Sequence, residues 1–225
     1  MRRVDLAVRE GEILGLIGPN GYGKTTLFNL ITGFYRPDGG RIRLGERDVT
    51  GWPPPRLCKQ GIARTFQLVR PFQQLTVRQN VEVGRVYGRE PARDRRQAAA
   101  QAEALLDLVG LADRADSPAG RLTLVDRKRL ELARALATRP SVLLLDELLA
   151  GLNPSEVLAA IELIRRIRAS GVTIVLVEHL VKAVFGVSDR VAVLSAGRKI
   201  AEGTPAAVAG DPAVIDAYLG TASHA

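Results

Sequence analysis

A glycine-rich segment at residues 18–25 reads GPNGYGKT and fits the pattern G-x-x-x-x-G-K-[ST], which is typical of loops that bind phosphate groups. Its glycines allow backbone N–H groups to surround a polyphosphate, and a helix that follows directs its positive end toward the anion. We expect Lys24 to contact the β- and γ-phosphates of a nucleotide and Thr25 to bind Mg²⁺ through its hydroxyl group. The alternative is a glycine turn with a surface lysine, which is disfavoured because an apolar strand precedes the motif and an amphipathic helix begins at Lys24.

A second candidate for chemistry is the acidic pair in the segment VLLLDE at residues 142–147. Its four apolar residues predict a buried strand, whose end would place Asp146 beside the phosphate loop as a partner of magnesium. Glu147 supplies the carboxylate that a hydrolase needs near the γ-phosphate to orient and deprotonate water. Taken alone, an acid after an apolar run is common at strand ends, but together with the phosphate loop the pair favours nucleotide hydrolysis.

Short apolar runs predict the strands that must position these residues. Residues 12–17 read EILGLI, an almost wholly apolar run that is typical of a strand buried in a parallel sheet. Three similar runs and a more exposed strand pair around Gly45 are expected at residues 142–145, 172–177, 190–194 and 41–49.

Helical patterns lie between these strands and fill the middle of the chain. On the helix that begins at Lys24, the apolar residues at helical spacing are Leu27, Ile31 and Phe34. Asn153 and Pro154 predict the cap and first residue of another helix, which ends at Gly171. The stripe that this helix should bury contains Val157, Ile161, Ile164 and Ile167. Residues 71–140 show helical patterns only.

Strands and helices alternate on both sides of this helical middle, which favours one domain with an insertion over two tandem domains. We therefore predict a single α/β domain over residues 1–225. Residues 1–70 and 140–225 would form a nucleotide-binding core with a parallel sheet, and residues 71–139 an inserted all-helical subdomain. A small antiparallel β region would lie near the N-terminus.

The composition disfavours several other classes of protein. The chain has 225 residues, of which 46% are hydrophobic and 25% charged, as in globular proteins that bury a core. No apolar run approaches the roughly 18 residues of a membrane helix, and no apolar signal core is expected at the N-terminus. The single cysteine, Cys58, fits a reducing cytosol. A net charge of +8 could indicate nucleic acid or an anionic membrane surface as partner, but the 22 Gly and many Ala and Arg residues suggest a GC-rich genome, so we attribute the charge to a solvated surface.

The remaining motifs distinguish among nucleotide hydrolases. A guanine-specific GTPase would carry N-K-x-D, which is absent. The segments GPNGYGKTT, ARTFQ, RLELARALATRPSVLLLDE, AGLNP and VLVEH, in this order over nearly the whole chain, resemble the ATPase subunits of ATP-binding cassette (ABC) transporters. Residues 61–67, 75–84 and 201–220 are similar to those of ATPases that drive import of branched-chain amino acids. Importers of amides and urea share such segments and remain an alternative.

This resemblance implies a P-loop NTPase fold with a RecA-like core, with ATP as substrate, Mg²⁺ as cofactor and a head-to-tail dimer. The residues it makes catalytic are Glu147, His179, Gln67 and Lys24, and those near the metal are Thr25, Gln67 and Asp146. Gln67 would contact Mg²⁺ and the attacking water, and His179 would hold the γ-phosphate and the water against Glu147. The residues alone leave other interpretations open, because Gln67 also fits a loop glutamine and His179 a structural histidine after a strand.

The same resemblance implies nucleotide contacts from further segments and from partner proteins. Thr123 would contact nucleotide from the signature segment, and Asn153 from a loop that crosses the dimer interface. The phosphate loop would contribute Gly18, Pro19, Asn20, Gly21, Tyr22, Gly23, Lys24, Thr25 and Thr26. The partners would be transmembrane permease subunits, a second ATPase subunit and, indirectly, a solute-binding protein, with no nucleic acid. The chain would lie peripherally at the cytoplasmic face of the inner membrane.

The signature segment departs from the family pattern L-S-G-G-Q, because residues 122–126 read LTLVD. Thr123 keeps a hydroxyl that can cap the following helix, with Asp126 answering it three residues later as in a capping box. The glycines that permit close approach to phosphate are replaced, and Asp126 adds negative charge at the anion-binding end. We therefore expect slow hydrolysis, or a partner subunit with an intact signature.

Three smaller departures and two rival functions remain. Leu148 replaces the proline that follows the acidic pair in the family, and Tyr22 replaces a small residue of the phosphate loop. Family members usually carry a further segment before VDLAV, with an aromatic residue that stacks on adenine; a truncated or misplaced start is the expected reason for its absence.

The rival functions are a non-transport cassette ATPase acting on DNA or ribosomes, and a degenerate regulatory cassette. His224 is expected to be solvated.

Overall fold

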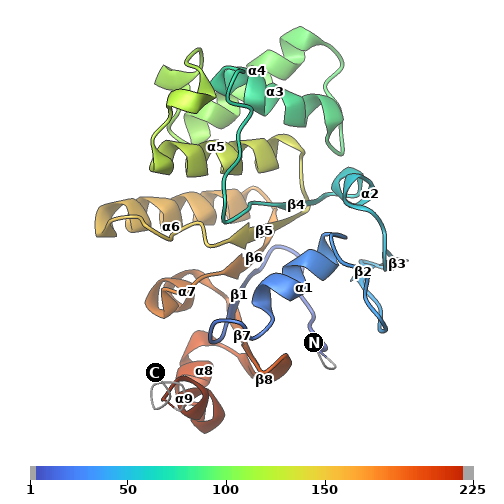
Figure 1. Ribbon diagram of the computed structural model, residues 1–225, viewed down its shortest axis with the longest axis vertical. Coiled ribbons are helices and arrows are strands. Elements are labelled where there is room, and N and C mark those ends of the chain that lie inside the picture. The colour runs from blue at the N-terminus through green and yellow to red at the C-terminus, as the bar shows by residue number, and fades with distance from the viewer. Residues whose placement is uncertain (1–3, 220–225) are drawn as a thin grey trace. The chain divides into compact units, whose positions relative to one another are not determined.

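The structure is a computed structural model that describes residues 4–219, so His224 lies outside the described part of the chain. The main sheet has six strands in the order β4-β5-β6-β1-β7-β8 (Figure 1). Their bounds are Ile13–Ile17 for β1, Ile62–Arg64 for β4, Val142–Asp146 for β5, Thr173–Val177 for β6, Arg190–Ser195 for β7 and Arg198–Gly203 for β8. The predicted strand pair near the N-terminus is the antiparallel hairpin of β2 (Arg43–Leu44) and β3 (Arg47–Asp48).

The chain divides into two compact units. Unit 1 comprises residues 1–54 and 144–225, and unit 2 comprises residues 55–143, so the boundary crosses β5. Unit 2 thus begins earlier in the sequence than the predicted helical subdomain, because it includes β4 and most of α2 (Pro54–Lys59). The predicted functional division at residues 71–139 stays a prediction.

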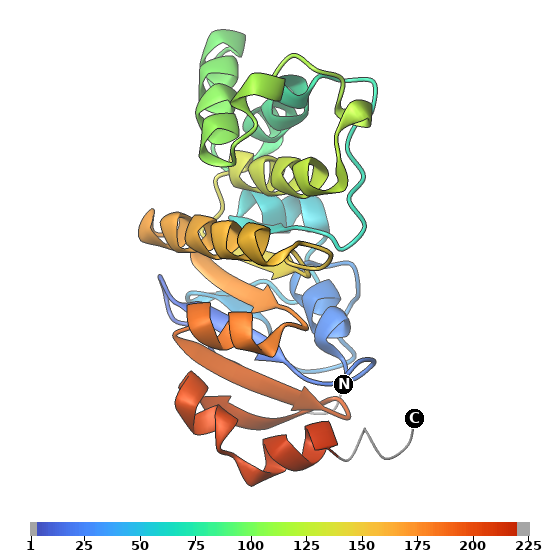
Figure 2. The ribbon, with the colours of Figure 1, turned by 90° about the vertical axis from the view of Figure 1, so that its left-hand side faces the viewer.

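The sheet of unit 1 is centred on β1, which pairs in parallel with β6 on one side and with β7 on the other. All five residues of β1 and all five of β6 are buried, as their continuous apolar runs predict for a sheet covered on both faces. The sequence patterns did not predict β8, which pairs antiparallel with β7 at the edge of the sheet. Helices α8 (Pro205–Ala209) and α9 (Pro212–Leu219) lie beside this edge (Figure 2).

The helix after the phosphate loop is shorter than the apolar spacing suggested. Helix α1 spans Lys24–Ile31, and the side chains it buries are Lys24 and Phe28. Phe34 lies beyond the end of the helix and is 53% exposed, so the prediction that it continues the apolar face of this helix was wrong. The reason is local: Gly33 adopts a φ of 76°, which ends the helix one turn before Phe34 could join its apolar face.

Helix α6 (Pro154–Ala169) begins as predicted. Asn153 caps it, accepting a hydrogen bond from the Glu156 N–H at 2.9 Å, while the Glu156 side chain accepts one from the Asn153 N–H at 2.8 Å. Of the predicted stripe, Ile164 and Ile167 are buried. Helix α7 (Val181–Val187) completes the helices of unit 1.

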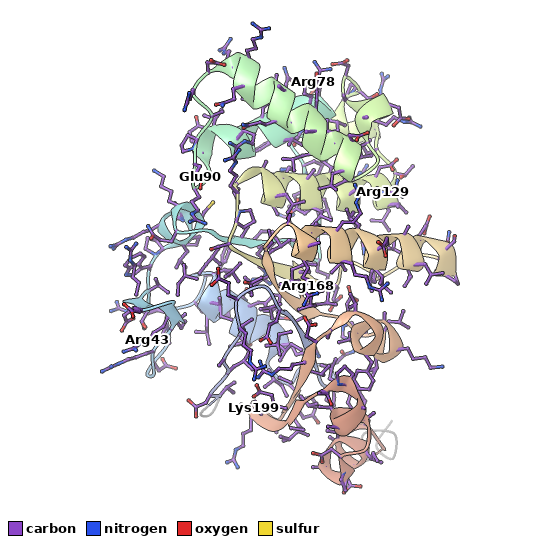
Figure 3. All side chains as sticks on the ribbon, turned by 180° about the vertical axis from the view of Figure 1, so that it is seen from behind. Arg43, Arg78, Glu90, Arg129, Arg168 and Lys199 are labelled. Atoms are coloured by element: carbon purple, nitrogen blue, oxygen red, sulfur yellow. The ribbon has the colours of Figure 1, made fainter. Side chains whose placement is uncertain are left out.

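Ion pairs join the ends of three strands in unit 1 away from the phosphate loop. Arg190 on β7 donates to Glu12 at 2.8 Å, just before β1, and also pairs with Glu202 on β8. Lys199 pairs with the same Glu202, and Arg168 donates to the Gly11 carbonyl at 2.8 Å; both cations are labelled in Figure 3. The carboxylates of Glu12 and Glu202 in these ion pairs are largely buried, with 7% and 18% of their side chains exposed.

Unit 2 is mostly helical, as predicted for the middle of the chain. Besides α2, it contains α3 (Val77–Tyr87), α4 (Arg95–Leu108) and α5 (Leu124–Ala137), which pack on one another, and short 3-10 turns at Ala112–Arg114 and Ala119–Arg121. A capping box formed by Thr76 and Gln79 begins α3. Among residues 4–219, no helix combines the length and apolarity needed to cross a membrane.

Candidate nucleotide-binding site

The phosphate-loop motif lies between β1, which ends at Ile17, and α1, which begins at Lys24. Three glycines give the loop its path, with φ values of 148° at Gly18, 79° at Gly21 and 103° at Gly23. Residues with a Cβ rarely adopt these values. A Cβ on Gly18 would also come within 2.0 Å of the Leu194 carbonyl oxygen on β7, so the loop passes directly against the sheet.

The N-terminus of α1 is suited to hold an anion. Gly23 occupies the N-cap position and offers no side-chain cap, and the first turn contains no acidic residue. The first N–H groups of a helix have no partner within the helix, and the helix dipole adds positive potential there. Phosphate oxygens satisfy both conditions, and therefore the observed geometry fits a bound polyphosphate.

Lys24 lies at the centre of the site. Its ammonium group donates to the carbonyl oxygens of Gly18 at 2.6 Å and Pro19 at 3.0 Å, and the residue is buried. Burial lowers the pKa of Lys24 below its ordinary value, while attraction to Glu147 and Asp146 acts in the opposite direction. The structure therefore brings the loop lysine and the acidic pair of β5 within electrostatic reach of each other.

The acidic pair lies at the carboxyl end of β5. Asp146 is only 4% exposed, and Glu147 follows with a φ of 51°, a left-handed conformation that is uncommon for residues other than glycine. The Glu147 N–H donates to the Val177 carbonyl at 2.9 Å, which extends the pairing of β5 with β6 by one residue. His179 Nε2 lies 2.6 Å from Glu147 Oε1, within hydrogen-bond distance.

The residues present fit a magnesium ion that is held mainly by its nucleotide. Mg²⁺ is commonly bound through one or two carboxylates plus substrate phosphates, without an all-protein cage. Within the described residues, no group of three or more His, Cys, Asp or Glu side chains could hold a metal by itself. Asp146 supplies one buried carboxylate, and Thr25 an exposed hydroxyl in the first turn of α1.

Gln67 and Thr123 belong to unit 2, and their predicted contacts with nucleotide stay predictions. Gln67 is exposed, and the segment around it, which includes Phe66 and Arg70, is bonded to side chains of α5. Arg134 donates to the Arg70 carbonyl at 3.3 Å and to Glu131 at 3.0 Å. Burial raises the pKa of Glu131, and attraction to Arg134 and a hydrogen bond from the Phe66 backbone oppose the rise.

Thr123 and Asn153 both act as helix caps. The Thr123 hydroxyl accepts a hydrogen bond from the Asp126 N–H at 3.2 Å, as the sequence predicted for the start of α5. Next to it Leu124 is 59% exposed, so a large apolar side chain stands where the family pattern has a small residue. Asn153 caps α6 and is exposed, and its contact across a dimer interface stays a prediction.

Two residues near the site were missed by the sequence analysis. A hydrogen bond links the backbone of Gly18 to Tyr218 on α9, and burial raises the pKa of this tyrosine. Glu178, which is 3% exposed, accepts a hydrogen bond from the Leu149 N–H at 2.6 Å. No local pattern could indicate the first contact, because 200 positions separate residues 18 and 218. A charged residue directly after an apolar strand, as in VLVEH, was the available signal for the second.

The two loop glycines predict different effects of alanine. Gly18→Ala should reduce the free energy of unfolding through backbone strain of about 1–3 kcal/mol and through the clash with Leu194, which adds about 1–3 kcal/mol. Gly21→Ala is the matched control, because its Cβ would meet nothing within 4 Å and only the strain remains. Urea unfolding of both variants measures the difference, and equal midpoints would contradict the observed contact.

Comparisons with known proteins agree with this geometry. Residues 1–150 match the family described as "ABC transporter", and residues 198–224 match the family described as "Branched-chain amino acid ATP-binding cassette transporter". The high-affinity branched-chain amino acid transport ATP-binding protein LivG of Salmonella typhimurium is 44% identical, covering 99% of this chain and 92% of LivG. The crystal structure of the ADP conformation of MJ1267, an ATP-binding cassette of an ABC transporter, has a TM-score of 0.86 at 32% identity, covering 96% of this chain and 90% of MJ1267. The dimeric structure of the bacterial ABC transporter cassette MJ0796 has a TM-score of 0.81 at 25% identity, covering 90% of this chain and 89% of MJ0796.

Proposed function

Because the chain belongs to the ABC transporter family of ATP-binding cassettes, we propose that it is the ATP-hydrolysing subunit of an importer of branched-chain amino acids. The observation that carries hydrolysis is the meeting of Lys24, the acidic pair and His179 at one end of the sheet in unit 1. The observation that carries the substrate class is the similarity to LivG over almost the whole chain, together with the family match at residues 198–224.

In the proposed reaction the phosphate loop and the N-terminus of α1 bind the phosphates of ATP, and Lys24 offsets their charge. Glu147 orients the attacking water and accepts its proton, which is the role that a positioned carboxylate performs in general base catalysis. His179 orients the Glu147 carboxylate through their 2.6 Å contact. Gln67 is proposed to contact the attacking water, as the family resemblance implies.

Mg²⁺ is proposed to be held by Thr25, Asp146 and Gln67 together with the nucleotide. When bound, Mg²⁺ would supply positive charge that offsets the negative charge developing on the transferred phosphoryl group. Asp146 is suited to this role because its carboxylate is buried and lies near Lys24.

A second cassette is proposed to complete the site in a head-to-tail dimer, with Thr123 and Asn153 at the interface. The dimeric structure of MJ0796 supports this pairing, since that cassette shares the fold of this chain. The conformational change of the dimer would be transmitted to transmembrane permease subunits, and a solute-binding protein would deliver the amino acid to them. This arrangement places the chain peripherally at the cytoplasmic face of the inner membrane.

Uptake of labelled solutes tests the proposed substrate class. Cells that lack this chain should lose uptake of radiolabelled leucine, isoleucine and valine, and the intact gene should restore it. Restoration should fail with Lys24→Ala, because the variant loses the charge that faces the phosphates. Normal leucine uptake combined with lost uptake of urea or short amides would instead assign the chain to the related importers of those solutes.

A further inference from the structure

The turn that follows the acidic pair is attached to a buried carboxylate. Glu178 is 3% exposed, and its Oε1 accepts a hydrogen bond from the Leu149 N–H at 2.6 Å in the interior of unit 1. A hydrogen bond between a carboxylate and a backbone N–H is charge-assisted and stronger than one between neutral groups. Burial of a carboxylate is costly unless such bonds compensate for the lost water, and the Leu149 N–H supplies one of them.

Glu178 is the middle one of three consecutive residues that contact this turn. The Val177 carbonyl accepts the Glu147 N–H at 2.9 Å, and His179 Nε2 lies 2.6 Å from Glu147 Oε1. Glu178 adds a third connection at Leu149, two residues past Glu147. The end of β6 therefore contacts the backbone of Glu147, its carboxylate and the turn beyond it.

These connections act on a strained residue. Glu147 has a φ of 51°, and left-handed backbone is strained in a residue other than glycine. Such a conformation persists only where the surrounding structure fixes it. The Val177 bond fixes the residue on its N-terminal side, and the Glu178 bond fixes the turn on its C-terminal side. Removing the second bond would allow the turn, and with it the Glu147 carboxylate, to move.

We propose that Glu178 is a positioning residue for hydrolysis, which keeps the Glu147 carboxylate and the His179 ring in one fixed arrangement by holding the Leu149 N–H. This inference rests on the proposed hydrolytic function and adds to it a residue that acts through Glu147 and His179. Displacement of a reacting group by about 1 Å can cost about a hundredfold in rate. The position of the acceptor oxygen, more than the charge of residue 178, is therefore the property that the rate should depend on.

Two substitutions of Glu178 distinguish the position of its side-chain oxygen from its charge. Glu178→Gln keeps an oxygen at the same distance from the backbone and removes the charge, whereas Glu178→Asp keeps the charge and withdraws the oxygen by one methylene. The expected single-turnover rate at saturating Mg·ATP is within about threefold of wild type for Glu178→Gln and roughly ten- to a hundredfold lower for Glu178→Asp. The Kd for ATP should change little in either variant, because Glu178 lies outside the phosphate loop.

Thr173→Val is the matched control at the opposite end of β6. Thr173 is 5% exposed, and its hydroxyl accepts the Gly11 N–H at 3.0 Å, so the variant also removes a buried hydrogen bond to the backbone without changing the shape of the side chain. Its urea midpoint should fall, and its hydrolysis rate should remain that of wild type. A purely structural role of Glu178 would make Glu178→Asp behave in the same way, and a wild-type rate in Glu178→Asp would overturn the proposal.

The outcomes also separate this proposal from the proposed function. Hydrolysis is measured on the purified chain, so an incorrect transported substrate leaves the test unaffected. Hydrolysis by wild type and by Glu178→Asp at equal rates overturns the role of Glu178 alone. A wild-type chain that binds ATP and never cleaves it, either alone or together with the second ATPase of the same transporter, overturns both.

Discussion

Glu147→Gln should lower the rate of ATP hydrolysis by about 10²–10⁴-fold, the usual contribution of a general base, while ATP remains bound. The amide has nearly the same shape as the carboxylate but cannot accept a proton from water. The phosphate loop and Lys24 are unchanged, so the affinity for ATP should be close to that of wild type. Release of inorganic phosphate and equilibrium binding of ATP are the two measurements.

Glu162→Gln provides the matched control for this experiment. Glu162 is an exposed carboxylate on α6, paired with Arg165 at 3.6 Å, and it lies outside the site. The same change of charge there should leave both hydrolysis and binding unaltered. Unchanged turnover in Glu147→Gln would remove Glu147 from the mechanism, whatever the control shows.

The altered signature segment leads to the second large effect. We expect the purified chain to hydrolyse ATP slowly by itself. In a dimer whose other subunit carries an intact L-S-G-G-Q segment, the rate should be about 10²–10³-fold higher, because a missing preorganised donor to developing charge costs a factor of this size. In this chain Leu124 is 59% exposed at the start of α5, and Asp126 lies in the first turn. A carboxylate at this end of a helix opposes the binding of an anion.

Steady-state hydrolysis by the chain alone, and after addition of the second ATPase of the same transporter, measures this effect. In the chain alone, Asp126→Asn should raise the rate, and Asp116→Asn should not, because Asp116 is an exposed carboxylate paired with Arg78 elsewhere in unit 2. Cooperative hydrolysis at a full rate by the unassisted chain would show that the altered signature needs no partner. Failure to hydrolyse in either setting would favour the degenerate regulatory cassette.

The local features of the site could be predicted because each depends on neighbours in the sequence. The glycines at residues 18, 21 and 23 adopt the left-handed backbone that the motif requires, and α1 begins at Lys24 as expected. The apolar runs at β1, β5, β6 and β7 form buried strands within a residue or two of their predicted bounds. Asn153 and Thr123 cap the helices that follow them.

Other features of the fold depend on more than the apolar pattern. Phe34 continued the helical spacing of α1, but the left-handed Gly33 ended the helix first. The sequence of β8, RKIAEG, contains charged residues and lacks the apolar run that identified the other strands. Its pairing with β7 shows that an edge strand can form where only one side of the strand is bonded.

The phosphate loop, the acidic pair and the family could be predicted from the sequence alone, because contiguous residues of suitable type and spacing encode each of them. Tertiary structure alone decided that Glu178 binds the turn at Leu149 and that Tyr218 reaches Gly18, and it shows that the expected pairing of His179 with Glu147 is a direct contact of 2.6 Å. The physical reason is the order of the strands: β6 lies beside β5, and the chain after β8 returns toward the phosphate loop. Such neighbours are fixed by burial of apolar surface across the whole sheet, which no short segment specifies.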